Sequence, residues 1–154
     1  MMLIFGKQSM NTWKKRMDYK KIFVDSDILL DVLLSREPFN KYGQLLLQES
    51  RDRDYKLYSS TLILANVFYM VAKKFNRLVA KEQLKILSSM VDMLPFESEN
   101  IFQALNSIHI DFEDTIQFFI AKKHNCELII SRNIKHYKQF DLPIMTAEQF
   151  LQIL

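Results

Sequence analysis

The sequence predicts an α/β protein of three layers, α/β/α, in which helices cover both faces of a central, mostly parallel sheet. Short apolar runs rich in β-forming residues alternate with longer segments whose apolar residues recur at helical spacing. Strands that alternate with helices form right-handed βαβ units, which build parallel sheets. The 154 residues include only 2 glycines and 3 prolines, which argues against a loop-rich all-β design. This length fits one domain with a full core.

The first strand is expected at 22–24, where a continuous apolar run suits a strand buried on both faces. The run stops at Asp25, and from Asp27 the apolar residues follow helical spacing. A buried strand that ends in a carboxylate places it at the carboxyl edge of the sheet, where open α/β sheets bind ligands. The alternative is that Asp25 or Asp27 serves only as the N-cap of the following helix.

The rest of the chain continues this alternation. Pro38 interrupts the pattern after the first helix, and the charged residues 51–54 are predicted to form a solvated turn. We expect the aromatic ring of Phe112 to lie in the core, together with Leu105 and Ile108 on the apolar side of the preceding helix. Further strands are expected at 56–59, 93–96, 127–131 and 142–145, and further helices around 45–47 and at 61–75, 78–91, 97–107, 111–121 and 150–154.

Residues 1–20 are expected to form an N-terminal extension to a domain that spans 21–154. The extension is either a flexible basic tail or the product of a mis-assigned start, because Met17 lies four residues before the first strand. The net charge of +3 is compatible with binding to nucleic acid but does not demonstrate it. The single Cys126 excludes an intramolecular disulfide. Without a signal peptide or an apolar run of about 18 residues, a cytoplasmic location without membrane contact is expected.

Three segments are predicted to converge on one edge of the sheet: the strand end at Asp25, the helix start at Asp114 and the strand end at Ser131. With these segments, the sequence resembles the PIN-domain family of metal-dependent ribonucleases, which includes bacterial toxins. The resemblance spans about residues 21–154. It rests on Val24-Asp25-Ser26-Asp27-Ile28-Leu29-Leu30-Asp31, Arg36-Glu37-Pro38-Phe39, Phe112-Glu113-Asp114-Thr115 with Ala121, Ile130-Ser131-Arg132-Asn133-Ile134-Lys135-His136-Tyr137, and the closing segment 142–150.

The resemblance implies a cluster of about four acidic residues that holds Mg²⁺ or Mn²⁺ for phosphodiester hydrolysis. The first acid matches Asp25 and the third matches Asp114, so these two are the expected catalytic residues and metal ligands. The second acid is usually a glutamate, where this chain has Asn66. The fourth is usually an aspartate, where this chain offers Asn133 and His136.

The replaced acids leave the expected cluster short of negative charge for two divalent ions. Asp27 would add a carboxylate if its side chain turned inward, although the resemblance implies an orienting role for it. His136 as a neutral ligand would favour Mn²⁺ or Zn²⁺, and the alternative that we favour is a histidine on a surface loop. Asp31, Asp111 and Glu113 are expected to be solvated or to cap helices.

Two functions follow from the resemblance. The first is a metal-dependent endoribonuclease with a partly degenerate acidic cluster, acting as the toxin of a toxin–antitoxin pair. The alternative is a catalytically inactive PIN-like domain that binds RNA or a protein. The implied partners are an RNA substrate, a small antitoxin protein and a second copy of the chain. A phosphotransfer receiver domain also places acids at strand ends, but the chain lacks a good candidate for the late lysine of that fold.

Overall fold

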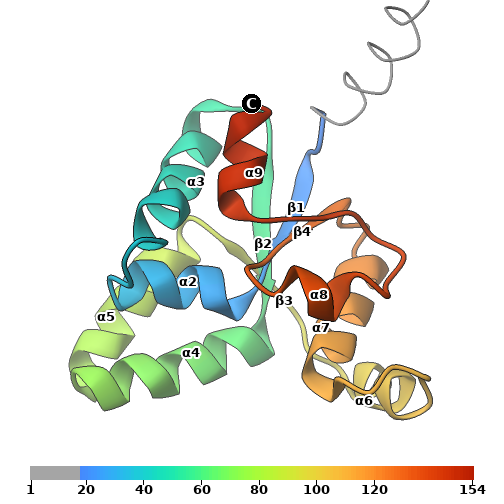
Figure 1. Ribbon diagram of the computed structural model, residues 1–154. Helices are drawn as coiled ribbons and strands as arrows, with labels where there is room; N and C mark the ends of the chain where they lie inside the picture. The colour runs from blue at the N-terminus through green and yellow to red at the C-terminus, as the bar shows by residue number, and fades with distance from the viewer. Residues whose placement is uncertain (1–17) are drawn as a thin grey trace, which may run out of the picture.

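The computed structural model describes residues 18–154, which form a five-stranded parallel sheet between helical layers (Figure 1). The strands are ordered β3-β2-β1-β4-β5, and every neighbouring pair is parallel. In chain order they are β1 (Lys21–Val24), β2 (Lys56–Ser60), β3 (Asp92–Leu94), β4 (Leu128–Ile130) and β5 (Ile144–Met145).

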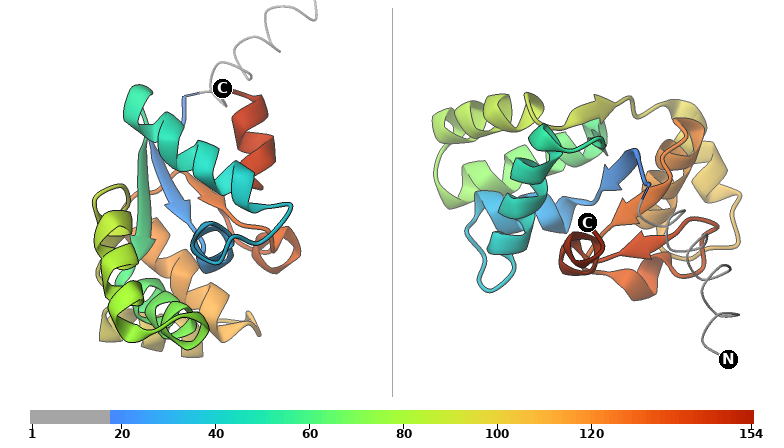
Figure 2. Two further views of the ribbon diagram at one scale, coloured as in Figure 1. Left: turned by 90° about the vertical axis from the view of Figure 1, so that its left-hand side faces the viewer. Right: turned by 90° about the horizontal axis from the view of Figure 1, so that it is seen from above.

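Helices cover both faces of this sheet, which confirms the predicted α/β/α class. One face carries α2, α3 and α9, with α4 and α5 beside them, and the opposite face carries α6 and α7 (Figure 2). The helices are α2 (Ser26–Leu33), α3 (Asn40–Asp52), α4 (Thr61–Lys74), α5 (Arg77–Ser88), α6 (Ser98–Leu105), α7 (Phe112–Lys123), α8 (Ile134–Tyr137) and α9 (Ala147–Gln152).

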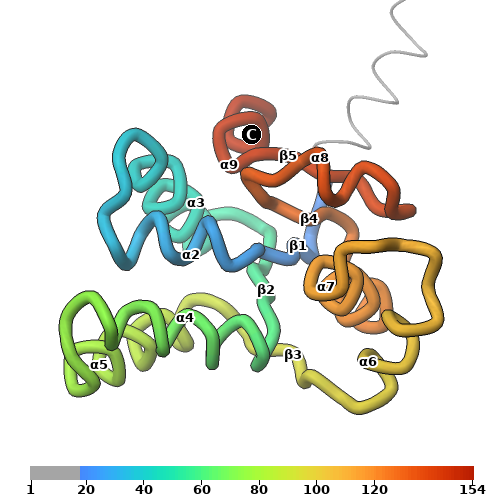
Figure 3. The backbone as a smooth tube through the Cα atoms, turned by 60° about the horizontal axis from the view of Figure 1, so that its bottom comes forward, coloured from blue at the N-terminus to red at the C-terminus, as the bar shows by residue number. Residues whose placement is uncertain are grey.

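Strand β1 is the centre of the fold. Its residues Ile22, Phe23 and Val24 are fully buried, as expected for a strand covered on both faces. The chain proceeds from β1 to β2 on one side, whereas β4 lies on the other side, so the order of the strands reverses between β1 and β4. In open α/β sheets, the crevice beyond the carboxyl ends of the strands at such a reversal is the usual place for a ligand. The tube of Figure 3 shows the ends of β1 and β4 between α2 and α7.

The structure corrects the expected burial on and after α6. Leu105, Ile108 and Phe112 are 63%, 92% and 42% exposed, so the expectation that they pack in the core is wrong. Helix α6 ends at Leu105, which leaves Ile108 in the connection to α7 instead of on a helical face. The buried positions of α6 are Asn100 and Ala104.

Two smaller expectations also change. The third strand is Asp92–Leu94 and not 93–96, since the chain after Leu94 reaches Pro95 and then begins α6. Phe75, the last residue of the helix expected at 61–75, is instead the C-cap of α4 and is 53% exposed.

Most of the predicted N-terminal extension lies outside the described residues, and its properties stay a prediction. Within the described part, Tyr19 packs against the hydrophobic core, and the backbone N–H of Lys20 donates to Glu127 Oε1 at 3.0 Å. None of the helices in residues 18–154 combines the length and apolarity that a membrane span requires.

Replacing Gly43 with alanine tests the close packing of α3 on α2. An added Cβ at Gly43 would lie 2.5 Å from Val32 Cγ2, and valine has few rotamers with which to move away. We expect Gly43→Ala to lower the free energy of unfolding by about 1–3 kcal/mol, although glycine-to-alanine exchange normally stabilises a helix. Denaturant unfolding measures this, with the exposed neighbour Gln44→Ala as control. The double variant with Val32→Ala should recover part of the loss; a stabilised Gly43→Ala would contradict the packing argument.

Candidate functional site

Asp25 lies at the carboxyl end of β1, in the crevice where the strand order reverses. Its side chain is buried, and its backbone N–H donates to Ile130 O at 2.9 Å. Oδ1 accepts the N–H of Ser26 at 2.8 Å and caps α2, while Oδ2 accepts the Ser131 hydroxyl at 2.9 Å. Capping of α2 therefore uses only one oxygen of Asp25. The other oxygen is bound by Ser131, which directly follows the neighbouring strand β4.

Asp27 turns toward the same crevice from the first turn of α2. Its Oδ2 accepts the backbone N–H of Arg132 at 2.9 Å and lies 3.4 Å from Ser131 Oγ. Its Oδ1 is buried and has no hydrogen-bond partner among the described residues. An unpartnered buried carboxylate oxygen is costly, so this atom is suited to bind a cation or to accept a hydrogen bond.

Asp111, Asp114 and His136 form a second group that faces the crevice from α7 and α8. Asp111 caps α7 by accepting the backbone N–H of Asp114 at 3.2 Å, as predicted. His136 Nδ1 lies 3.0 Å from Asp114 Oδ2 and 3.2 Å from Asp111 Oδ2. One ligand atom from each residue lies within 4.8 Å of the others, a spacing compatible with one metal ion. His136 is exposed, but it belongs to α8 and contacts these carboxylates, which a free surface-loop histidine would not do.

Tyr137 joins the two groups. It is fully buried, and its hydroxyl interacts with the carboxyls of both Asp25 and Asp114, although it forms no hydrogen bond of regular geometry. The sequence placed Tyr137 in the segment after the fourth strand but gave no sign of this role. Asp111 was likewise expected only as a cap, and its spacing of three residues from Asp114 was the available signal that both face the same side.

The crevice holds more negative charge than the chain neutralises. Burial, together with the charge of Asp114, raises the pKa of Asp25 from 3.8 to about 6, although the hydrogen bonds from Ser26 and Ser131 oppose the shift. Burial and then the charge of Asp25 raise the pKa of Asp27 to about 6, and burial also raises the pKa of Asp114. Within residues 18–154, no lysine or arginine forms an ion pair with any of the three. Like charges gathered in this way favour a bound cation.

The side chains of Asn66 and Asn133 form no hydrogen bond with this cluster. Asn66 is exposed on α4 and lines a hollow of about 400 Å³ together with Ser26 and the exposed Glu113. Asn133 is exposed at the start of α8, where its backbone N–H donates to Ser131 Oγ at 3.0 Å. Of the six residues singled out in the sequence, the structure gathers Asp25, Asp27, Asp114 and His136 and leaves the two amide side chains apart.

Asp31 is buried, so the expectation that it is solvated is wrong. Arg132 donates to it twice, from Nε to Oδ2 at 2.7 Å and from Nη2 to Oδ1 at 3.0 Å. The guanidinium also covers Phe39, with Cζ 4.2 Å from the centre of the ring. This pair joins α2 to the turn after β4 across 101 residues, a contact that no local sequence pattern indicates.

Three comparisons with known proteins bear on the family and the fold of this chain. The family model of the PIN domain matches residues 21–135. "Ribonuclease VapC1" of Aquifex aeolicus (strain VF5) is 26% identical over 141 residues, which cover 88% of this chain and 96% of the relative. Among solved structures, VapC20 of Mycobacterium tuberculosis, described as a sarcin–ricin loop cleaving toxin, has a TM-score of 0.61 at 14% identity, covering 76% of this chain and 93% of its own. A toxin–antitoxin complex from Klebsiella pneumoniae has a TM-score of 0.61 at 18% identity, covering 82% and 97%. At these identities the two structures show a shared fold.

Asp25→Asn tests whether the ionised carboxylate destabilises the metal-free protein. Since the pKa of Asp25 is raised in the folded state, the cost of ionisation is absent below its ordinary pKa of 3.8, grows as pH rises to about 6 and is complete above it. Asparagine caps helices as well as aspartate. In chelator, Asp25→Asn should therefore gain about 1–3 kcal/mol at neutral pH and nothing near pH 4. Urea unfolding at both pH values, beside the exposed control Asp141→Asn, measures this; a loss at neutral pH would show that the charged form stabilises.

Arg132→Met tests the ion pair with Asp31. Removing the arginine leaves a buried carboxylate without its partner, and we expect a loss of about 2–4 kcal/mol. Asp31→Asn should lose less, because the side chain of Arg132 is 32% exposed and can reach water. Thermal and denaturant unfolding compare the two, with Arg53→Met, which breaks the exposed pair with Glu49, as a nearly silent control. Equal losses for Arg132→Met and Arg53→Met would refute the argument.

Proposed function

This chain belongs to the PIN-domain family, and on that premise we propose that it is a metal-dependent ribonuclease that acts as the toxin of a toxin–antitoxin pair. The observation that carries the proposal is the convergence of Asp25, Asp27 and Asp114 on one crevice, with no lysine or arginine in an ion pair with any of them among the described residues. Buried carboxylates in this arrangement are suited to a divalent cation, which neutralises them. The ribonuclease from Aquifex aeolicus and the toxin from Mycobacterium tuberculosis support the same reaction class.

The residues present fit a single divalent ion. Asp25 and Asp114 are the proposed carboxylate ligands, and Asp111 and His136, which lie beside Asp114, offer a further carboxylate and an imidazole. The imidazole favours Mn²⁺ over Mg²⁺, which prefers oxygen ligands and retains most of its water. When bound, such an ion polarises a phosphate oxygen and makes a water more nucleophilic.

The chain's own residues position the reacting groups. Ser26 and Ser131 fix the orientation of the Asp25 carboxylate, which therefore needs little rearrangement when a ligand arrives. The buried hydroxyl of Tyr137 interacts with the carboxyls of both Asp25 and Asp114. The free Oδ1 of Asp27 is suited to accept a hydrogen bond from a water that attacks the phosphate.

The two asparagines support a degenerate form of this site. An amide oxygen can coordinate a hard cation but brings no charge, so the affinity for metal falls with each carboxylate that is replaced. With Asn66 and Asn133 at positions where the family pattern has acids, we propose weak metal binding and slow cleavage. The same observation favours the second candidate function, a PIN-like domain that binds RNA or a protein without cleaving it.

The partners that we propose are RNA and a small antitoxin protein. The complex from Klebsiella pneumoniae, a toxin with its antitoxin, supports the second of these. A second copy of the chain is a further proposed partner. The cytoplasm, where RNA is accessible, is the proposed location.

Calorimetry with Mn²⁺ tests the degenerate site. Asn66→Glu should tighten binding on the order of tenfold, because it adds a charged oxygen ligand at the edge of the crevice. Gln83→Glu on the exposed side of α5 adds the same charge elsewhere and should leave the affinity unchanged. Asp25→Asn should abolish the remaining binding.

Cleavage of RNA, measured in Mn²⁺ and in chelator, separates the two candidate functions. We expect slow cleavage that requires the ion, is lost in Asp25→Asn and is faster in Asn66→Glu. RNA binding without cleavage by either wild type or Asn66→Glu would establish the inactive binding domain instead. Tight binding of two ions by the wild type, with fast cleavage, would contradict the proposed degeneracy.

A further inference from the structure

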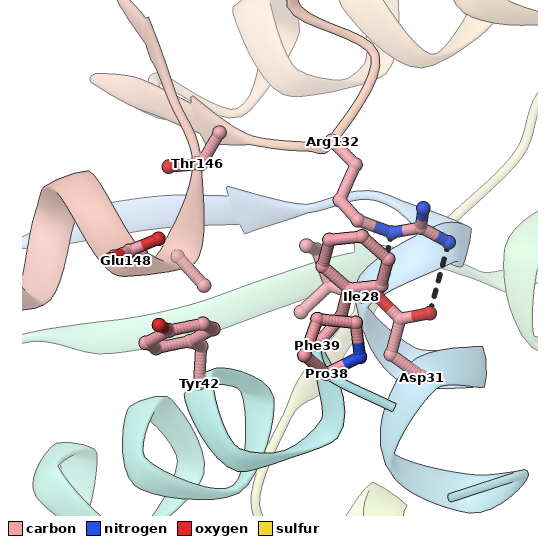
Figure 4. Close-up of a pocket in the computed structure, with 9 residues that line it drawn as sticks. Ile28, Asp31, Pro38, Phe39, Tyr42, Arg132, Thr146 and Glu148 are labelled. Atoms are coloured by element: carbon pink, nitrogen blue, oxygen red, sulfur yellow. Dashed lines mark hydrogen bonds and ion pairs between the residues drawn. The ribbon is translucent and has the colours of Figure 1, made fainter. Parts of the chain in front are cut away.

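We propose that a cleft beside the acidic crevice binds an unpaired guanine base of the RNA, an inference that rests on the proposed ribonuclease function. The cleft encloses about 320 Å³ between α2, α3, α9 and the turn after β4. Figure 4 shows Tyr42 and Glu148 on one side of it, the Arg132–Asp31 pair on the other, and Phe39 beside that pair. We call it the base cleft.

The base cleft adjoins the acidic crevice, because Arg132 contributes to both. The backbone N–H of Arg132 binds Asp27 in the crevice, while the guanidinium of the same residue lines the base cleft. Ser131, the preceding residue, holds Asp25. A single-stranded RNA whose phosphate lies at the crevice therefore has a neighbouring nucleotide in position to enter the cleft.

The walls of the cleft offer planar groups of the kind on which unpaired bases stack. Phe39 is 39% exposed, and the Arg132 guanidinium that covers one side of its ring is fixed by two hydrogen bonds to Asp31. Tyr42 is half-buried opposite them. Proteins that recognise single-stranded RNA commonly stack bases on aromatic rings and arginine planes.

The polar groups of the cleft match guanine better than the other bases. Glu148 is exposed and has no hydrogen bond or ion pair within residues 18–154, and a carboxylate can only accept. Guanine presents two adjacent donors, N1–H and N2–H, whereas each of the other three bases has an acceptor beside its donor. Arg132 gives Asp31 two of its five N–H groups, which leaves donors for the O6 and N7 acceptors of guanine.

The proposal is tested by RNA binding in chelator, where metal-dependent cleavage does not occur. The probe is a short fluorescein-labelled oligouridine with one central guanosine, compared by anisotropy with the same RNA carrying inosine, which lacks the 2-amino group. The wild type should bind the guanosine probe about tenfold more tightly, the scale of one hydrogen bond to a charged group. Glu148→Gln should erase that preference, and Glu82→Gln, the same change on the exposed side of α5, should retain it.

A second pair of variants tests stacking. Phe39→Ala should weaken binding of both probes about tenfold, while Phe102→Ala, which truncates an exposed phenylalanine on α6, should not. Circular dichroism checks that each variant is folded. The proposal is overturned if the wild type shows no preference for guanosine, if the two glutamate variants behave alike, or if Glu148→Gln and Phe39→Ala weaken binding of the antitoxin but not of RNA. Guanosine preference without cleavage in Mn²⁺ would refute the proposed ribonuclease and leave the base cleft supported.

Discussion

The parallel pairing of β1 with β4 is the interaction on which the rest of the site depends. It places the end of one strand beside the end of the other, so that the backbone N–H of Asp25 donates to Ile130 O and its carboxylate accepts the hydroxyl of Ser131. In the chain, β2 and β3 follow β1 and lie on one side of it, whereas β4 lies on the other side. A crevice is expected where the strand order reverses in this way. A buried aspartate is tolerated here because donors from α2 and β4 hold its two oxygens.

The excess of negative charge distinguishes this crevice from an ordinary helix cap. A cap alone would place one solvated carboxylate at the start of α2, whereas the capping residue here, Asp25, is buried. The structure adds Asp27 and Asp114, whose pKa values are also raised by burial, and encloses the group with Tyr137. Repulsion between the buried carboxylates therefore destabilises the metal-free protein, and a bound cation would remove this repulsion.

Arg132 connects this electrostatic centre to the surface beside it. Its backbone holds Asp27, its guanidinium holds Asp31, and the plane of the guanidinium covers Phe39. One residue therefore fixes the first helix to the turn after β4 and forms a wall shared by the crevice and the base cleft. This arrangement links the stability of the fold to the geometry in which a strand of RNA would lie.

The order of strands and helices could be predicted from the sequence because the hydrophobic period is a local property: the buried run of β1, the caps at Asp25 and Asp111 and the helix that follows Asp114 are all visible within a few residues. The sequence also indicated that Asp25, Asp114 and Ser131 lie at one edge, because parallel strands end on the same side. Only the tertiary structure decided that Asp31 is buried against Arg132, that His136 faces Asp111 and Asp114, and that Asn66 is exposed. Those positions depend on how α2, α4, α7 and α8 rotate and pack on the sheet. Such rotations are set by side-chain contacts between segments up to about a hundred residues apart, which local spacing does not encode.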